Sequence, residues 1–209
     1  MDSNKVKLLL LFLVVLALII SCIHPLYPRE MYLQHSATIV MIGFLFYVCI
    51  KNNLSNLSYF LIALLTMLHI IGARWIYSYT PYDHWIQSLF GFSIDKLFHF
   101  KRNDYDRFVH LMYGFLLVIP LCEISKKWFL VPAKITRHFA LLFILATSMG
   151  YEVFEWLLSV FLSPEQADAY NGQQGDMWDA QKDMALAMLG AILMILILKI
   201  KTKKNDQIT

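Results

Sequence analysis

The sequence has little charge and few cysteines. Only 16% of its 209 residues are Asp, Glu, Lys or Arg, whereas 58% are hydrophobic. This composition is too apolar for an ordinary soluble domain. The net charge of +3 is small, and the basic residues do not form the surface typical of nucleic-acid binding. The three cysteines show no paired spacing, so they predict neither a disulfide framework nor a CxxC metal or redox motif.

Familiar sequence signatures are also missing. The chain has no HExxH, no GxSxG and no P-loop, so no known hydrolase or nucleotide-binding motif assigns a reaction. It has no internal repeat, no low-complexity tract and no alternating strand pattern. These absences disfavour a closed β-barrel and leave a helix bundle as the way to satisfy the backbone in lipid.

Long apolar runs are present instead. They predict an all-α polytopic bundle of about six transmembrane helices. The bundle is expected to form one integral domain in the cell membrane over residues 1–209. The second and fourth runs are short for a hydrocarbon core of about 30 Å. The predicted spans are Leu8–Ile23, Ser36–Ile50, Leu54–Ile71, Phe108–Leu121, Phe139–Leu162 and Met184–Ile200.

The basic residues predict the orientation. Most of them lie near the N-terminus, in the 51–53 turn, in the 122–138 loop and near the C-terminus. Because cytoplasmic segments carry an excess of Lys and Arg, both termini are expected in the cytoplasm and the 72–107 and 163–182 segments outside. The first span follows Lys5 and Lys7, and we interpret it as an uncleaved anchor helix rather than a signal peptide.

Acids and histidines fall at the outer ends of four spans. An ionisable residue within a span is costly and predicts a functional site, and spacings of three or four place such residues on one helix face. We therefore expect a shared polar pocket at the outer mouth of the bundle. Its residues are His69 in the third span, Asp106 and His110 in the fourth, Glu152 and Glu155 in the fifth, and Asp176, Asp179 and Asp183 at the start of the sixth.

Small residues follow these aspartates. Ala185, Ala187, Gly190 and Ala191 are expected to let the sixth span approach its neighbours closely and bring the acids inward.

Structural roles compete with the pocket. Asp176 and Asp179 fit the favourable acidic start of a helix, and His110 can bond to a backbone carbonyl inside the bundle. Glu152 can instead form a buried ion pair with one of three basic residues, which are Arg74, Arg107 and Lys182.

Four segments cover most of residues 68–191; they are "LHIIGARWIYSYTP", "YDRFVHLMYGFLLVIP", "GYEVFEW" and "YNGQQGDMWDAQKDMALAMLGA". Together they resemble the YjdF family of uncharacterised inner-membrane proteins, and they occur in the family's order. The resemblance implies a multi-pass membrane fold and a cell-envelope context, but no reaction.

A second set of residues comprises Asp106, Arg107 and His110 in one span, Glu152 or Glu155 in the next, and Asp183 with Gly190 in the last. In these positions the chain is more distantly similar to VanZ-like proteins. The family's arginine before the last helix is missing, and Lys182 is the nearest basic residue.

The first functional hypothesis is a membrane-embedded enzyme that acts on a lipid or lipid-linked substrate from the outer side. The eight pocket residues are its candidate metal ligands; oxygen-rich sets favour Mg²⁺, Mn²⁺ or Ca²⁺, and the histidines admit Zn²⁺. The cation would polarise a phosphoryl or carbonyl group or activate water. Asp106, His110, Glu152 and Asp183 are the candidate catalytic residues, with Glu152 or Asp183 as general base and Asp106 orienting His110.

Two other hypotheses stay open. The acids can form a cation or proton relay in a transporter, although polar residues gather on only one side of the membrane. The chain can also be a non-enzymatic envelope protein that binds a lipid head group or another membrane protein. The substrate and the oligomeric state do not follow from the sequence.

Overall fold

A computed structural model describes residues 3–161, 163, 167, 170–172 and 174–206, with side chains up to Lys201. The described residues form helices and turns, without strands. Six helices are long and apolar enough to cross a membrane, which confirms the predicted all-α bundle. They are α1 (Ser3–Ser21), α2 (Pro28–Lys51), α3 (Asn56–Arg74), α6 (Tyr105–Trp128), α7 (Thr136–Phe161) and α9 (Asp179–Asp206).

The second and fourth spans are longer than predicted. Helices α2 and α6 each have 24 residues, which corresponds to about 36 Å at a rise of about 1.5 Å per residue. The first turns of α2 contain polar residues, so the apolar pattern did not reveal that the helix begins at Pro28. Helix α6 contains Pro120 and continues past the predicted end at Leu121 as far as Trp128. The predicted end of the fifth span, Leu162, lies outside the described residues.

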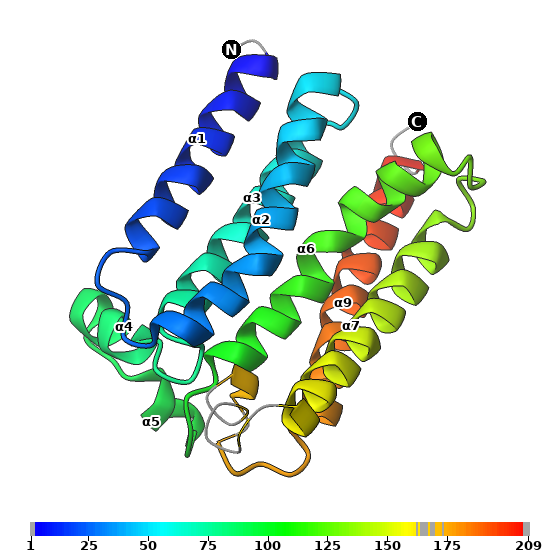
Figure 1. Ribbon diagram of the computed structural model, residues 1–209. Helices are drawn as coiled ribbons and strands as arrows, with labels where there is room; N and C mark the ends of the chain where they lie inside the picture. Colours follow the sequence, from blue (N-terminus) through cyan, green and yellow to red (C-terminus); the bar gives the residue numbers. More distant parts are fainter. Residues whose placement is uncertain (1–2, 162, 164–166, 168–169, 173, 207–209) are drawn as a thin grey trace.

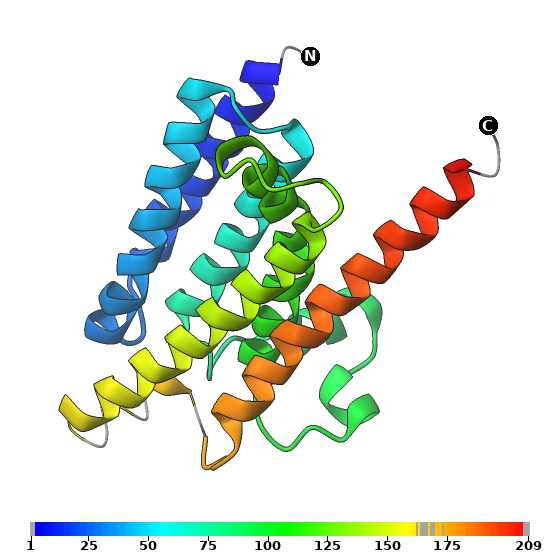
Figure 2. The same cartoon turned by 90° about the vertical axis from the view of Figure 1, so that its right-hand side faces the viewer.

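The long helices form two groups of three. Helices α1, α2 and α3 contact one another, and so do α6, α7 and α9. Among the described residues the two groups meet chiefly through α3 and α6, which lie side by side in the middle of the bundle (Figure 1). Both termini lie at the same end of the bundle (Figures 1 and 2), as an even number of spans requires.

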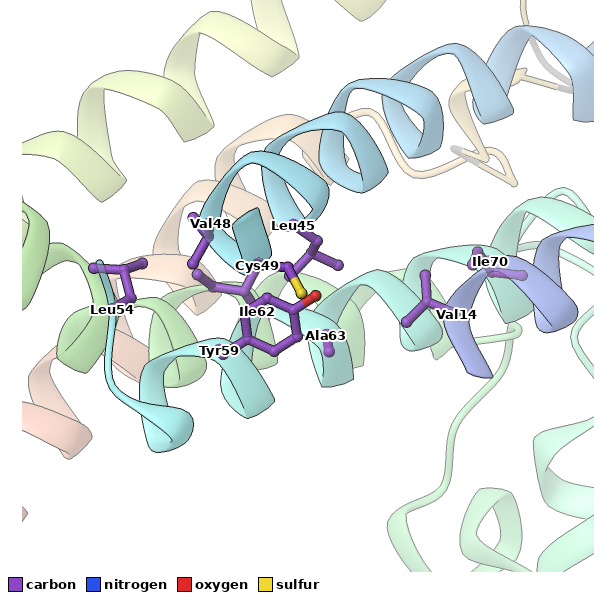
Figure 3. Packing of buried hydrophobic residues seen from close by; sticks show 9 residues of the cluster. All are labelled: Val14, Leu45, Val48, Cys49, Leu54, Tyr59, Ile62, Ala63 and Ile70. Atoms are coloured by element: carbon purple, nitrogen blue, oxygen red, sulfur yellow. The ribbon is translucent and has the colours of Figure 1, made fainter. Parts of the chain in front are cut away.

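The first group packs around an apolar core. Figure 3 shows Tyr59 and Ile62 of α3 against Leu45 and Val48 of α2, with Val14 of α1 beside Ile70. Such packing, rather than exclusion from water, holds helices together in lipid.

Helix α1 packs through apolar residues against the first core and adds polar contacts at both ends. It buries only Lys7, Val14 and Ser21, which are spaced by seven residues and therefore lie on one face. The fully buried Lys7 Nζ donates to Asn52 Oδ1 (2.5 Å) and to the Leu54 carbonyl (2.6 Å). At the other end, Ser21 Oγ lies 2.9 Å from His35 Nε2.

The second group is held by a very close contact between α6 and α9. A Cβ atom on Gly114 would lie 1.9 Å from the Ala187 carbonyl oxygen, and one on Gly190 would lie 2.1 Å from that of Leu111. Ala187 and Ala191 are fully buried in this contact, as predicted. Ala185 is exposed and does not take part.

Two short helices occupy the 72–107 segment, where the sequence predicted none. They are α4 (Tyr82–Phe90) and α5 (Ile94–Phe98), and they lie at the end of the bundle opposite the termini (Figure 1). Gly91 takes the left-handed conformation that ends α4, and Ser93 Oγ accepts the Lys96 backbone N–H at the start of α5.

Candidate acid and histidine site

The acids gather at the end of the bundle opposite the termini. Helices α6 and α9 both begin there, at Tyr105 and Asp179, so the positive ends of two helix dipoles lie beside the carboxylates. Helix α7 contributes Glu152 from its second half. The close contact at Gly114 and Gly190 fixes the separation of the helices that carry the other residues.

Three side chains form the centre of the site. Asp106, His110 and Asp183 each offer one ligand atom, and these atoms all lie within 4.8 Å of one another. The His110 Nε2 atom lies 3.7 Å from Asp106 Oδ1 and 3.8 Å from Glu152 Oε1. These separations are too long for direct hydrogen bonds. They fit ligands that share one ion at about 2.0–2.6 Å from each.

Two carboxylate oxygens in the centre have no partner. Glu152 and Asp183 are only 7% and 2% exposed, and neither Glu152 Oε1 nor Asp183 Oδ1 forms a hydrogen bond. Among the described residues, no lysine or arginine lies within ion-pair distance of Asp106, Glu152 or Asp183. Buried polar atoms are nearly always satisfied in native proteins, so these oxygens point to a ligand.

An arginine network lies beside this centre. Arg102 Nη1 donates to Asp179 Oδ1 at 2.6 Å, and Arg107 Nη1 donates to Asp104 Oδ1 at 2.7 Å. Arg107 also pairs with Asp176 and, at 3.3 Å, with Asp179. The acids of the loops before α6 and α9 are therefore neutralised by cations, unlike those of the centre.

His69 belongs to a neighbouring hydrogen-bonded pair. Its Nε2 donates to the Gln34 carbonyl at 3.1 Å, because a carbonyl can only accept, so its Nδ1 accepts from the Tyr77 hydroxyl at 2.5 Å. Burial raises the pKa of Tyr77 well above its usual range, and the nearby Asp106 carboxylate adds to this effect. Both ring nitrogens of His69 are thus engaged outside the centre.

The structure separates the eight predicted site residues into groups. Asp106, His110, Glu152 and Asp183 form the centre. Asp176 and Asp179 belong to the arginine network, and His69 pairs with Tyr77. Glu155 is partly buried one turn from Glu152, with which it interacts directly.

The structure also decides between the alternative roles. Glu152 pairs with none of the three basic residues proposed for it. Arg74 donates to carbonyls of the 20–23 segment, and Lys182 binds Asp176. Asp176 precedes α9 and accepts the Trp178 backbone N–H, so it lies outside the helix that carries Asp183.

Sequence reasoning missed Arg102 as a site residue. The available signal was charge complementarity, because "KRNDYDR" and "GDMWDAQKD" each open a span and carry opposite charges.

Asp176 is expected to give an acid-dependent contribution to stability. A hydrogen bond from Lys182 and another from the Trp178 backbone lower its pKa to about 2. Because the folded pKa lies below the ordinary value of 3.8, the contribution is complete above that value and is lost as the pH falls towards 2. The stability difference between the wild type and Asp176→Asn should shrink over this range in thermal unfolding. Lys182→Met removes one of these donors and should likewise reduce the stability contributed by Asp176. A stability difference between the wild type and Asp176→Asn that is constant with pH would contradict the lowered pKa of Asp176.

The fold and site define a polytopic membrane protein with a buried acid and histidine cluster at one end of its helices. Comparison with known proteins agrees with this class. The chain belongs to the family described as "Predicted membrane protein (DUF2238)", whose match spans residues 6–204.

A curated relative is the inner membrane protein YjdF of Escherichia coli (strain K12). It is 28% identical over 167 residues, which cover 79% of this chain and 76% of the relative. The predicted resemblance to the YjdF family and the location in the cell membrane are thereby confirmed. No solved structure matches.

Proposed function

We propose that the chain binds one divalent cation through Asp106, His110 and Asp183 and uses it to hydrolyse a phosphoester of a lipid-linked substrate at the outer leaflet. The observation that carries this proposal is the convergence of three ligand atoms within 4.8 Å beside unpartnered, buried oxygens of Glu152 and Asp183.

The balance of charge supports a cation. Three carboxylates, from Asp106, Glu152 and Asp183, share one small volume with a histidine, and burial makes their mutual repulsion costly. Arg102 and Arg107 are engaged by the acids of the surrounding network. A divalent ion would offset the repulsion and satisfy the oxygens that lack hydrogen bonds. Two oxygens and one imidazole nitrogen suit Zn²⁺ or Mn²⁺ better than Ca²⁺.

The proposed chemistry assigns one role to each group. When bound, the ion would polarise a phosphoryl oxygen and help to orient a water molecule. Glu152, which is close to His110 but outside the set of three ligands, accepts a proton from that water as its oxygen attacks phosphorus. The P–O bond to the lipid alcohol breaks, and the proton passes to the leaving oxygen. A free alcohol and a phosphate product result.

The depth of the site supports a substrate from the bilayer. Asp106 and His110 lie in the first two turns of α6, and Asp183 lies in the second turn of α9; both helices are candidate membrane spans. A substrate anchored in the outer leaflet would present its head group at this depth without leaving the membrane.

Metal content of the purified protein tests the proposal. The protein is prepared in mild detergent without chelator and measured by mass spectrometry. We expect roughly one ion per chain in the wild type, and a loss of at least about tenfold in Asp106→Asn and in Asp183→Asn. Asp176→Asn is the matched control, because it removes a carboxylate of the same end that belongs to the arginine network, and it should keep the ion.

A second measurement guards against variants that fold poorly. Zn²⁺ or Mn²⁺ should raise the unfolding temperature of the metal-stripped wild type, since a ligand that binds only the folded state stabilises it. If the wild type is metal-free and neither ion shifts its unfolding, the cluster serves helix packing. Cation flux into liposomes that Glu152→Gln abolishes would assign transport instead.

A further inference from the structure

An apolar cavity lies beside the candidate site, on a different face of α6. Its volume is about 420 Å³, which is within the range of small-molecule sites. Asp104, just before α6, and three residues of α6 follow the i, i+3, i+4, i+7 spacing of one helix face; the three are Arg107, Phe108 and Leu111. Asp106 and His110 are not among the lining residues. The lining residues are Tyr82, Ile86, Ile94, Phe100, Asp104, Tyr105, Arg107, Phe108, Leu111 and Leu186.

We propose that this cavity holds one hydrocarbon chain of a phosphate-bearing membrane lipid, with the phosphate at Arg107. The proposal deepens the proposed function, on which its interpretation as a substrate site rests. It names the part of the substrate that the protein would recognise: a long alkyl or isoprenoid chain joined to phosphate.

The lining and depth of the cavity fit such a chain. Phe108 and Leu111 belong to the membrane span α6, and Leu186 to the span α9. Apolar walls at this depth face hydrocarbon, and they offer few partners for water.

Helices α4 and α5 form the outer wall and place the cavity at the membrane surface. They direct Tyr82, Ile86 and Ile94 towards the cavity. Five other apolar residues of the segment from α4 to α5 are exposed, which is typical of helices that lie in the membrane interface. The exposed residues are Leu89, Phe90, Phe92, Leu97 and Phe98.

Hydrogen bonds hold this outer wall in place. Asp83 accepts from Ser93 Oγ at 2.8 Å and from the Asp95 backbone N–H at 3.1 Å. The Tyr82 hydroxyl donates to Asp95 Oδ1 at 2.6 Å. The two short helices are thereby fixed to each other, so the cavity is formed before any chain binds.

Arg107 supplies the polar end of the cavity. Its two terminal nitrogens donate to Asp104, Asp176 and Asp179, whereas its buried Nε–H has no partner. A buried guanidinium donor without an acceptor is unusual, and phosphate oxygens are preferred partners of arginine. Because this Nε–H is buried, the side chain must turn towards the cavity for a phosphate oxygen to reach it. The same arginine contacts Asp179, one turn before Asp183, so a phosphate at Arg107 would lie next to the candidate site.

Photolabelling of the full-length protein tests the chain site. The probe is phosphatidic acid with a diazirine in one acyl chain, presented in phosphatidylcholine nanodiscs. We expect the label on residues that line the cavity, and we expect Ile86→Trp to reduce it at least tenfold by filling the space. Leu89→Trp is the matched control, because it lies one turn along α4 and is 76% exposed. Labelling elsewhere, or labelling unchanged by Ile86→Trp, would overturn the chain site.

A second probe tests the head group without a mutation. Diacylglycerol with the same diazirine chain should label the cavity several-fold less than phosphatidic acid, and equal labelling would overturn the role of Arg107. Metal content is measured on the same samples. Labelled protein without metal supports the lipid site and contradicts the proposed function. Metal-bound protein without cavity labelling supports the metal site of the proposed function and contradicts the lipid site.

Discussion

Gly190→Ala is expected to destabilise the bundle, although alanine normally strengthens a helix. Replacing a helical glycine by alanine usually gains about 0.5–1 kcal/mol. At Gly190, however, the new Cβ would lie 2.1 Å from the Leu111 carbonyl oxygen and 2.8 Å from the Phe115 nitrogen. Both atoms are backbone and cannot rotate away, so α6 and α9 must separate. Overpacking of this kind typically costs about 1–3 kcal/mol, which reverses the sign.

The same change should weaken metal binding. His110 lies one turn before Gly114 on α6, and Asp183 lies two turns before Gly190 on α9. Moving the helices apart therefore lengthens the distance between two of the three proposed ligands. Even small displacements of ligands lower affinity, because the ion requires defined distances.

Thermal unfolding and metal content of the purified variants provide the measurement. Gly150→Ala is the matched control, since Gly150 lies inside helix α7 and its Cβ would meet no atom within 4 Å. It should leave stability unchanged or raise it slightly. Equal unfolding temperatures for the two alanine variants would show that α6 and α9 do not approach as closely as described.

Lys7→Met is expected to release the first helix from the bundle. Methionine matches the length of lysine and suits lipid, so a purely apolar view predicts little effect. The structure predicts the opposite, because Lys7 is fully buried and its ammonium bonds to Asn52 and to the Leu54 carbonyl. Losing a charged donor leaves the buried Leu54 carbonyl without this partner, at a cost of about 1–3 kcal/mol, whereas Asn52 is exposed and can bond to water.

A disulfide pair can report this release directly. The Ser3 hydroxyl donates to Asn56 Oδ1 at 2.6 Å, so Ser3→Cys with Asn56→Cys places two thiols across α1 and α3. The three native cysteines, which are free, are first replaced by serine. Lys7→Met should slow disulfide formation and lower the unfolding temperature. Lys5→Met removes the same charge from an exposed position and should do neither; a similar loss in both variants would contradict the role of Lys7.

The six long helices were predictable, because a long apolar run in a membrane protein is stable as a helix that spans the bilayer. The short helices α4 and α5 were not, since each spans few residues and α5 has only five. Their ends depend on Gly91 and Ser93, which are weak local signals beside a hydrophobic run. Lys7 could be interpreted only as a topology signal, because lysines near span ends usually extend to the interface.

The centre of the candidate site followed from helical spacing, and its limits did not. Asp106 and His110 are four residues apart, so one helix face had to carry both. Whether Asp176 joined them depended on where α9 begins, and the helix starts at Asp179, after Asp176. The arginine network required knowing that two loops distant in sequence meet, as Asn103 and Gln174 do through paired hydrogen bonds.

The division of the bundle into two groups of helices places the candidate site within one of them. All three proposed ligands, together with Glu152, are carried by α6, α7 and α9. A tilt of the first three helices about the α3–α6 contact would leave the ligand distances unchanged. The cavity, in contrast, is walled by α4 and α5, the segment that joins the groups. Bilayer thickness or lateral pressure that shifts one group against the other would act on the chain-binding space and spare the ion.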